Sequence, residues 1–203
     1  MPAGAQDSAK RKRASTGDKV TKVAKRRRSS NEEAEDPNAK ILLMEQGILE
    51  SKKNYNDIAT LLSIASRYED GEDESTLAAV TLCRIFLRLL AQGSLIAKKG
   101  LSEKDSVVVG WLKDQFSQYK TLLQNMLGDE DLAVTALTLC MRTLKAEGEN
   151  LYDKDEYTFP QAFLENIVSV LITSDNEDVR KAFLESYVEE YDDIRYYTFK
   201  SVK

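Results

Sequence analysis

The chain has 203 residues, no histidine, two cysteines and a formal net charge of −5. Without histidine it lacks the commonest general base and the commonest metal ligand, so we expect no enzymatic activity, catalytic residue, metal or cofactor. No apolar run reaches the roughly 18 residues of a membrane span, and the basic N-terminus has no apolar signal-peptide core. We therefore expect a soluble intracellular protein with no membrane partner.

The net charge conceals two oppositely charged parts. Residues 1–28 hold ten basic and two acidic side chains, whereas the remainder holds nineteen basic and thirty-two acidic ones. Residues 1–36 have almost no large apolar side chain, so we predict that they form a disordered basic tail. Residues 37–203 should form the folded, α-helical part.

Two basic clusters separated by eleven residues stand in this tail. They consist of Lys10, Arg11, Lys12, Arg13, Lys25, Arg26, Arg27 and Arg28. Their spacing resembles a bipartite nuclear-import signal, because an import carrier with two acidic grooves can take both clusters from one extended strand. A nonspecific RNA-binding arm or a merely solvated tail would have the same composition, and contact with RNA phosphates is compatible with import.

Ser29 and Ser30 follow the second cluster and precede a run of acidic residues. This arrangement is typical of sites for an acid-directed kinase, and phosphates there would offset the adjacent positive charge. A polar linker has the same composition, so modification of the two serines is a hypothesis with a structural alternative.

The remainder of the chain shows helical periodicity and no alternation that indicates a strand. Asn54 with Asp57 should cap the second helix, and Ser102 with Asp105 should form a capping box. We expect eight helical segments that begin near Pro37, Asp57, Thr76, Ser102, Asp131, Pro160, Asn176 and Asp192.

Two of these segments share a pattern at a constant displacement. Leu77, Ala78, Leu82, Leu89, Ala91 and Gly93 recur as Leu132, Ala133, Leu137, Leu144, Ala146 and Gly148. Each copy opens with acidic residues, is apolar nearly all round and closes on a glycine, which predicts a helix buried on several sides that stops there. We therefore predict an all-α fold, an irregular HEAT-like helical repeat stack (α-solenoid), with a compact bundle as the alternative.

The segment between the two copies should be an amphipathic helix. Its apolar face holds Val108, Leu112, Phe116, Tyr119, Leu122, Leu123 and Met126. Its polar face holds Lys113, Asp114, Ser117, Lys120, Gln124 and Asn125. A tight turn at Gly128 predicts an antiparallel neighbour, and residues 147–157 should form a polar loop.

Two pairs of residues within the helices have competing interpretations. Cys83 and Cys140 lie mid-helix among aliphatic residues, so we expect buried thiols rather than a disulfide or a metal pair. Arg84 and Arg88 are one turn apart, and we expect them to mark a solvent-facing edge rather than a binding site.

The helical pattern continues to the end of the sequence with unusually many aromatic side chains, so we expect that the chain was cut from a longer protein. Tyrosines dominate binding hot spots, which favours a protein-docking surface near the end. Packing within the core, or against helices further along the protein, is the alternative. The candidate partner surface consists of Tyr191, Asp192, Asp193, Arg195 and Tyr196.

Three stretches of the sequence resemble the family of nucleolar complex protein 4. They are Ala-Val-Thr-Leu-Cys-Arg-Ile-Phe at 79–86, Tyr-Thr-Phe-Pro at 157–160, and the segment 191–199, which opens with Tyr-Asp-Asp-Ile-Arg-Tyr. The last element is the most specific, and the likeness covers about residues 47–203.

The resemblance implies an α-helical, HEAT-like, non-catalytic scaffold that supports 18S rRNA processing and assembly of the small (40S) ribosomal subunit in the nucleolus. It implies as partners a nucleolar protein 14-type protein, other small-subunit processome proteins and pre-rRNA within the particle, and the tail adds a nuclear import carrier. Family members also carry a C-terminal CCAAT-binding-factor region, and we expect that this chain was cut before it. A HEAT-type nuclear adaptor or transport module is the alternative function.

Overall fold

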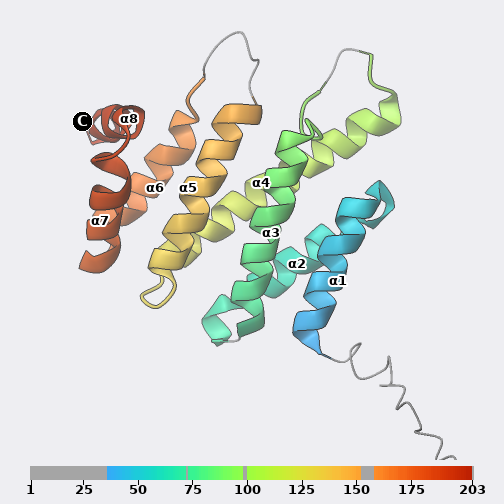
Figure 1. The fold of residues 1–203 in the computed structure, drawn as a ribbon, viewed down its shortest axis with the longest axis horizontal. Coiled ribbons are helices and arrows are strands. Elements are labelled where there is room, and N and C mark those ends of the chain that lie inside the picture. Colours follow the sequence, from blue (N-terminus) through green and yellow to red (C-terminus); the bar gives the residue numbers. More distant parts are fainter. Residues whose placement is uncertain (1–35, 72, 98–99, 152–157, 203) are drawn as a thin grey trace, which may run out of the picture.

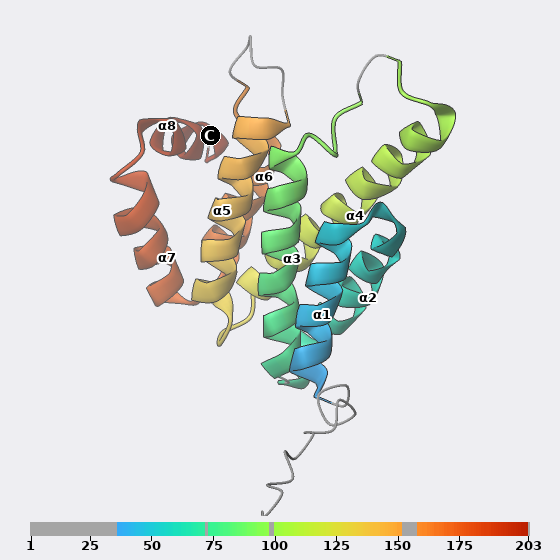
Figure 2. The same ribbon diagram turned by 45° about the vertical axis from the view of Figure 1, so that its right-hand side comes forward.

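The computed structural model describes residues 36–71, 73–97, 100–151 and 158–202. Within these residues the structure consists of helices that pack in pairs. One layer contains α1 (Pro37–Glu50), α3 (Asp73–Ala91), α5 (Ala133–Asn150) and α7 (Glu177–Phe183), side by side (Figures 1 and 2). The other contains α2 (Asn56–Ala65), α4 (Glu103–Leu127) and α6 (Gln161–Thr173), and α8 (Asp192–Ser201) packs on α6 at the end of the stack.

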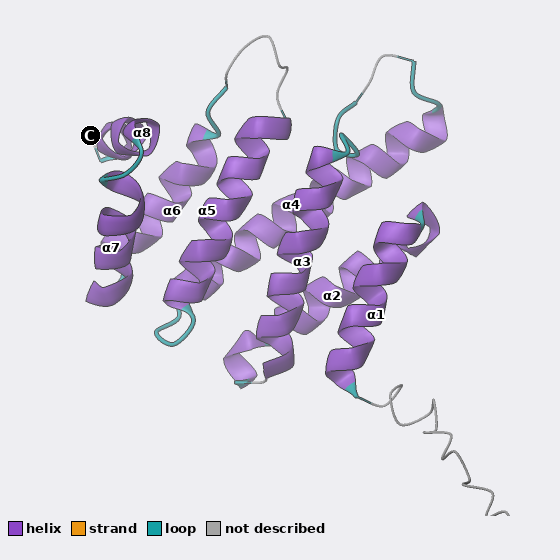
Figure 3. Ribbon diagram, in the orientation of Figure 1, coloured by secondary structure: helices purple, strands orange, loops and turns teal. Residues whose placement is uncertain are grey.

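The described residues contain helices and loops and no strand (Figure 3). Three short helical turns join the longer helices: η1 (Lys52–Asn54), η2 (Tyr68–Asp70) and the π-helix η3 (Leu184–Val188). The first and last helices lie at opposite ends of the stack (Figure 1). The predicted all-α solenoid is therefore confirmed, and the compact bundle is not the architecture.

Side-chain caps begin several helices where the sequence predicts them. The carboxylate of Asp36 accepts the backbone N–H of Asn38 ahead of α1. Ser102 accepts the N–H of Asp105 at 3.2 Å and donates its own hydroxyl to that carboxylate. The predicted cap at Asn54 is wrong, because its amide donates instead to the carbonyl of Gly47 at 2.9 Å and so satisfies the end of α1.

The repeated pattern marks the two helices at the centre of the first layer. Three of its six pairs are buried alike in α3 and α5: Ala78 and Ala133, Leu82 and Leu137, and Leu89 and Leu144. The shared sequence thus corresponds to a shared place in the stack, as expected for repeated helical pairs.

The closing glycines of the two copies have different roles. Gly93 has a φ of 69°, the left-handed conformation that ends α3. Gly148 lies inside α5, which continues to Asn150, so the prediction that this glycine stops the helix is wrong. A Cβ at Gly148 would lie 3.3 Å from Cδ of Pro160. The glycine is therefore explained by the close approach of the chain that enters α6.

Helix α4 packs its predicted apolar face against helices of both neighbouring pairs, among them α3 and α5. The ring of Phe86 in α3 lies 5.2 Å from that of Phe116 and 5.3 Å from that of Tyr119. The hydroxyl of Tyr119 donates to the carbonyl of Ala79 at 3.0 Å, so this buried polar group has a partner. The aromatic contacts hold α4 against α3.

A part-buried ion pair joins α4 to α5 beneath α6. The ammonium of Lys120 lies 3.0 Å from both carboxylate oxygens of Glu147, and 5.0 and 5.2 Å from the ring centroids of Phe116 and Phe163. The predictions that Lys120 faces solvent and that Glu147 belongs to a polar loop are therefore wrong. The packing of α6 over this part of α4 covers both residues.

Replacement of Lys120 by methionine should destabilise the protein by about 2–4 kcal/mol, because it leaves the carboxylate of Glu147 buried without a counter-ion. The double variant Lys120→Met/Glu147→Leu should regain most of that loss. Urea denaturation followed by circular dichroism measures both free energies of unfolding. Lys145→Met, which removes an exposed pair with Glu149, is the control and should cost less than about 1 kcal/mol. Equal effects of Lys120→Met and the control would contradict the assignment.

Candidate partner-binding surface

The two basic clusters of the tail and the serines Ser29 and Ser30 lie outside the described residues. The import signal and the phosphorylation sites therefore stay predictions. The candidate partner surface near the end of the chain lies within the described residues, at the corner between α7 and α8.

The π-helix η3 and the start of α8 form this corner. Tyr191 is the residue that precedes α8, with extended backbone, and its side chain is 54% exposed. Tyr196 is 62% exposed, and its ring meets that of Tyr197 edge-on at 5.0 Å. Both tyrosines are thus available to a partner, as the docking interpretation requires.

Three charged residues of the corner make contacts within it. Arg195 forms an ion pair with Asp192 and donates to the carbonyl of Glu189 at 3.5 Å. Asp193 accepts the backbone N–H of Ile194 at 2.8 Å. These contacts begin α8 and hold the corner, while Tyr191, Asp192, Asp193 and Tyr196 are exposed and Arg195 is half-exposed. The partner surface therefore stays a prediction.

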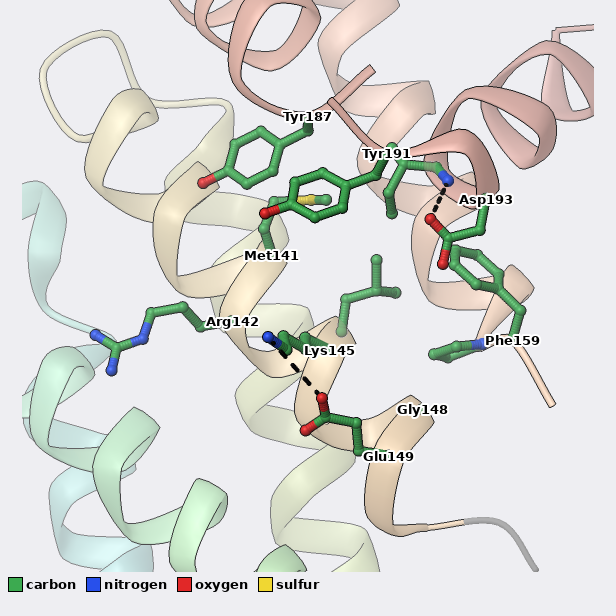
Figure 4. Close-up of a pocket in the computed structure, with 12 residues that line it drawn as sticks. Met141, Arg142, Lys145, Gly148, Glu149, Phe159, Tyr187, Tyr191 and Asp193 are labelled. Carbon is green, nitrogen blue, oxygen red and sulfur yellow. Dashed lines mark hydrogen bonds and ion pairs between the residues drawn. The ribbon is translucent and has the colours of Figure 1, made fainter. Parts of the chain in front are cut away.

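Two of the five, Tyr191 and Asp193, line a groove of about 370 Å³ beside α5 (Figure 4). Met141, Leu144 and Gly148 of α5 form its floor. The opposite wall consists of Phe159, Pro160, Tyr187, Tyr191 and Ile194, and the charged residues of the groove are Arg142, Lys145, Glu149 and Asp193.

Packing at the start of α6 fixes the far wall of the groove. The ring of Phe159 stacks on that of Tyr197 with a centroid distance of 4.2 Å and an interplanar angle of 5°. Pro160 lies against Gly148, where the glycine allows close approach. The wall is therefore held from α5 on one side and from α8 on the other.

Sequence reasoning missed the contribution of α5 to this groove. Arg142 and Lys145 fall in a segment that otherwise reads as apolar nearly all round. These two cations and Glu149 lie on one side of the helix. That one-sided charge indicates that this side of α5 is exposed. The opposite wall gives no such signal, because its residues come from three separate segments.

The Arg84 side chain is 39% exposed, as predicted for a solvent-facing edge, and it also forms an ion pair. Its guanidinium donates to both carboxylate oxygens of Glu45, at 2.8 and 2.6 Å, and so joins α3 to α1. Arg88 is exposed, as expected. The forked geometry of this pair makes Arg84 a structural residue.

Cys83 and Cys140 are free, buried thiols, as predicted. The sulfur of Cys83 lies 3.9 Å from the hydroxyl oxygen of Thr143. Burial raises the pKa of both thiols. Burial, and secondly the neighbouring Cys83, raises the pKa of Tyr119 well above its usual value. A thiol is a poor nucleophile while it keeps its proton, so these cysteines act as packing residues.

The buried thiols should make stability fall at alkaline pH. Above about pH 8.5 a thiol ionises in the unfolded chain but keeps its proton in the folded one, so ionisation favours unfolding. The free energy of unfolding should be unaffected below that pH and decline as pH rises. Urea denaturation at a series of pH values measures the slope, which should be shallower in Cys140→Ala. An identical slope in that variant would contradict the assignment.

No three side chains among the described His, Cys, Asp and Glu residues group in a way that suits a metal ion. In the same part of the chain, no helix has the length and apolar character needed to cross a membrane.

Stacked helical pairs in two layers define the class of this protein, which is an α-solenoid repeat protein. Residues 30–203 match the family described as "Nucleolar complex protein 4-like, TPR repeats". The chain therefore belongs to the nucleolar complex protein 4-like family. The family description uses the term TPR repeats, which, like HEAT repeats, are stacked helical pairs.

The chain is also similar to longer proteins. An uncharacterised protein of Schizosaccharomyces pombe is 31% identical over 165 residues, which cover 79% of this chain and 34% of that protein. Nucleolar complex protein 4 homolog B of Xenopus laevis is 26% identical over 83% of this chain and 34% of its own length. Nucleolar complex protein 4 homolog of Gallus gallus is 24% identical over 77% of this chain. The chain spans about a third of the length of these relatives.

Proposed function

We propose that the protein is a non-catalytic helical scaffold in nucleolar ribosome biogenesis, and that it acts in the small-subunit (40S) precursor particle, where it supports 18S rRNA processing. The observation that carries this proposal is the family match over residues 30–203. Two relatives bear the name nucleolar complex protein 4 homolog, which supports a nuclear and nucleolar location.

The structure supports a scaffold role in two ways. The layered stack exposes a long surface on each side, the kind of surface that solenoid proteins use for binding. Two of its buried polar groups, Tyr119 and Glu147, take part in packing and pairing between helices, as expected of a structural role.

The charge distribution supports protein partners for the helical part. The thirty-two acidic and nineteen basic residues beyond residue 28 disfavour a broad RNA-binding face. We propose a nucleolar protein 14-type partner and other processome proteins for the helical part. The basic tail would meet an import carrier and, inside the particle, phosphates of pre-rRNA.

Affinity purification of the tagged protein from cells tests the proposed function. Small-subunit processing factors and the precursor of 18S rRNA should co-isolate, and depletion of the protein should lower 18S rRNA while large-subunit rRNA is maintained. Co-isolation of nuclear transport carriers alone would favour the adaptor function and would reject the scaffold proposal.

Residues 1–36 fused to a reporter too large to diffuse through the nuclear pore test the import signal separately. The reporter should enter the nucleus, because both basic clusters are present, and alanine at the eight clustered residues should leave it cytoplasmic. Lys19→Ala/Lys22→Ala, which removes two charges between the clusters, is the control and should keep the reporter nuclear. Nuclear entry of the eight-alanine variant, seen by fluorescence microscopy, would contradict the prediction. The fusion lacks the helical part, so partners of that part cannot carry it.

A further inference from the structure

The groove beside α5 has the features of a binding site for one kind of partner segment. We propose that it binds a short amphipathic α-helix of another protein, with apolar side chains on the groove floor and an acidic side chain paired with Arg142. This inference rests on the proposed scaffold function and specifies the chemistry of one partner contact.

The groove exists because α7 is too short to cover α5. Helix α5 has eighteen residues, whereas α7 has seven, followed by five in the π-helix η3. The chain then turns at Tyr191 into α8, so the last two turns of α5 border the groove instead of a neighbouring helix (Figures 1 and 4). A π-helix at this place is consistent with function, since such turns are frequent at functional sites.

The floor of the groove follows one face of α5. Met141, Leu144 and Gly148 follow one another along one face of α5 over about 10 Å. A helix laid along such a stripe presents apolar anchors at intervals of three and four residues, which is the recurring way in which grooves bind amphipathic helices. The tyrosines on the opposite wall supply large, rigid contact area.

The charges of the groove specify the partner. Lys145 lies 3.9 Å from Glu149, and Asp193 accepts the N–H of Ile194. Arg142 is exposed and makes no hydrogen bond or ion pair with any residue that the structure describes, and its side chain extends from α5 away from Tyr191 and Phe159 (Figure 4). An acidic side chain of a partner would therefore meet Arg142 beside the groove and not on its floor.

Two tyrosine hydroxyls at the same end of the groove could also form hydrogen bonds with a partner. The rings of Tyr187 and Tyr191 lie beside Met141, and their hydroxyls have no hydrogen-bond partner in the described part of the chain (Figure 4). Tyrosine, arginine and methionine are the residues enriched where proteins bind one another. An apolar floor with one unpaired cation favours an acidic peptide over RNA, which requires several unpaired cations.

Selection of peptides of about 16 residues from a random display library, against the full chain, identifies a binding sequence. The enriched peptides should carry apolar residues at helical spacing with an aspartate or glutamate beside them. In NMR spectra of the protein labelled at the methionine methyl groups, such a peptide should shift the signal of Met141. Met44, half-buried in α1, is the internal reference and should not move.

Charge reversal provides the decisive comparison. Arg142→Glu should weaken binding of the selected peptide about tenfold or more, because a charge-assisted contact is replaced by repulsion. The same peptide with its acidic residue changed to lysine should bind Arg142→Glu better than it binds the unmodified protein. Arg88→Glu, the same change at an exposed arginine outside the groove, should leave binding unaltered. Tyr191→Ala is a second variant that should weaken binding, because it removes a large side chain from the wall of the groove.

Three results would overturn the inference: no selected peptide shifts Met141, the lysine peptide fails to bind Arg142→Glu, or single-stranded RNA shifts Met141 when no peptide does. These measurements use the purified chain. Their failure would therefore reject the groove without affecting co-isolation of precursor rRNA, which tests the scaffold function itself.

Discussion

The side-by-side packing of α3 and α5 is the contact on which the rest of the structure depends, because these two helices are shared between neighbouring pairs. Small side chains such as Ala79, Cys83 and Ala136 are fully or almost fully buried, which allows the helices to pack closely. Around this centre, α1 and α2 pack on α3, and α4 packs on both central helices. Each of α3 and α5 must therefore be apolar nearly all round, and the few polar groups that they bury are paired. Thr143 lies beside Cys83, and Glu147 is held by Lys120.

The same constraint explains why the candidate site lies at one end of the stack. Helix α3 lies between α1 and α5 in the layer, whereas α5 lies between α3 and the short α7, which the π-helix follows. The last turns of α5 border the groove, and the corner at Tyr191 supplies its second wall. The apolar groove floor thus follows from the repeat itself, since each inner helix has the apolar sides that its neighbour normally covers. The proposed function of the groove is recognition of a partner, and the chain belongs to a family whose relatives carry nucleolar complex names.

Much of this fold could be predicted from the sequence because its signals are local. The apolar spacing of α4, the cap at Ser102 and the repeated pattern in α3 and α5 each depend on residues within one helix or its turn. Except for the cap at Asn54, the wrong predictions depend on residues far apart in sequence. Lys120 and Glu147 are charged, and only the arrival of α6 buries them. Gly148 resembles a helix stop in the sequence. In the structure a glycine is needed there because Pro160, twelve positions later, packs closely against it. The groove could not be predicted, since η3 continues the helical pattern in sequence and its shortness is visible only in three dimensions.

Amide hydrogen exchange at increasing urea concentrations tests most directly whether α3 and α5 form the shared centre. If they do, their amides should be the slowest to exchange and should lose protection together, only upon global unfolding, because each helix buries the other. Helix α8, at the end of the stack, should exchange earlier. Loss of protection in α3 and α5 in two separate steps, at clearly different urea concentrations, would contradict this account.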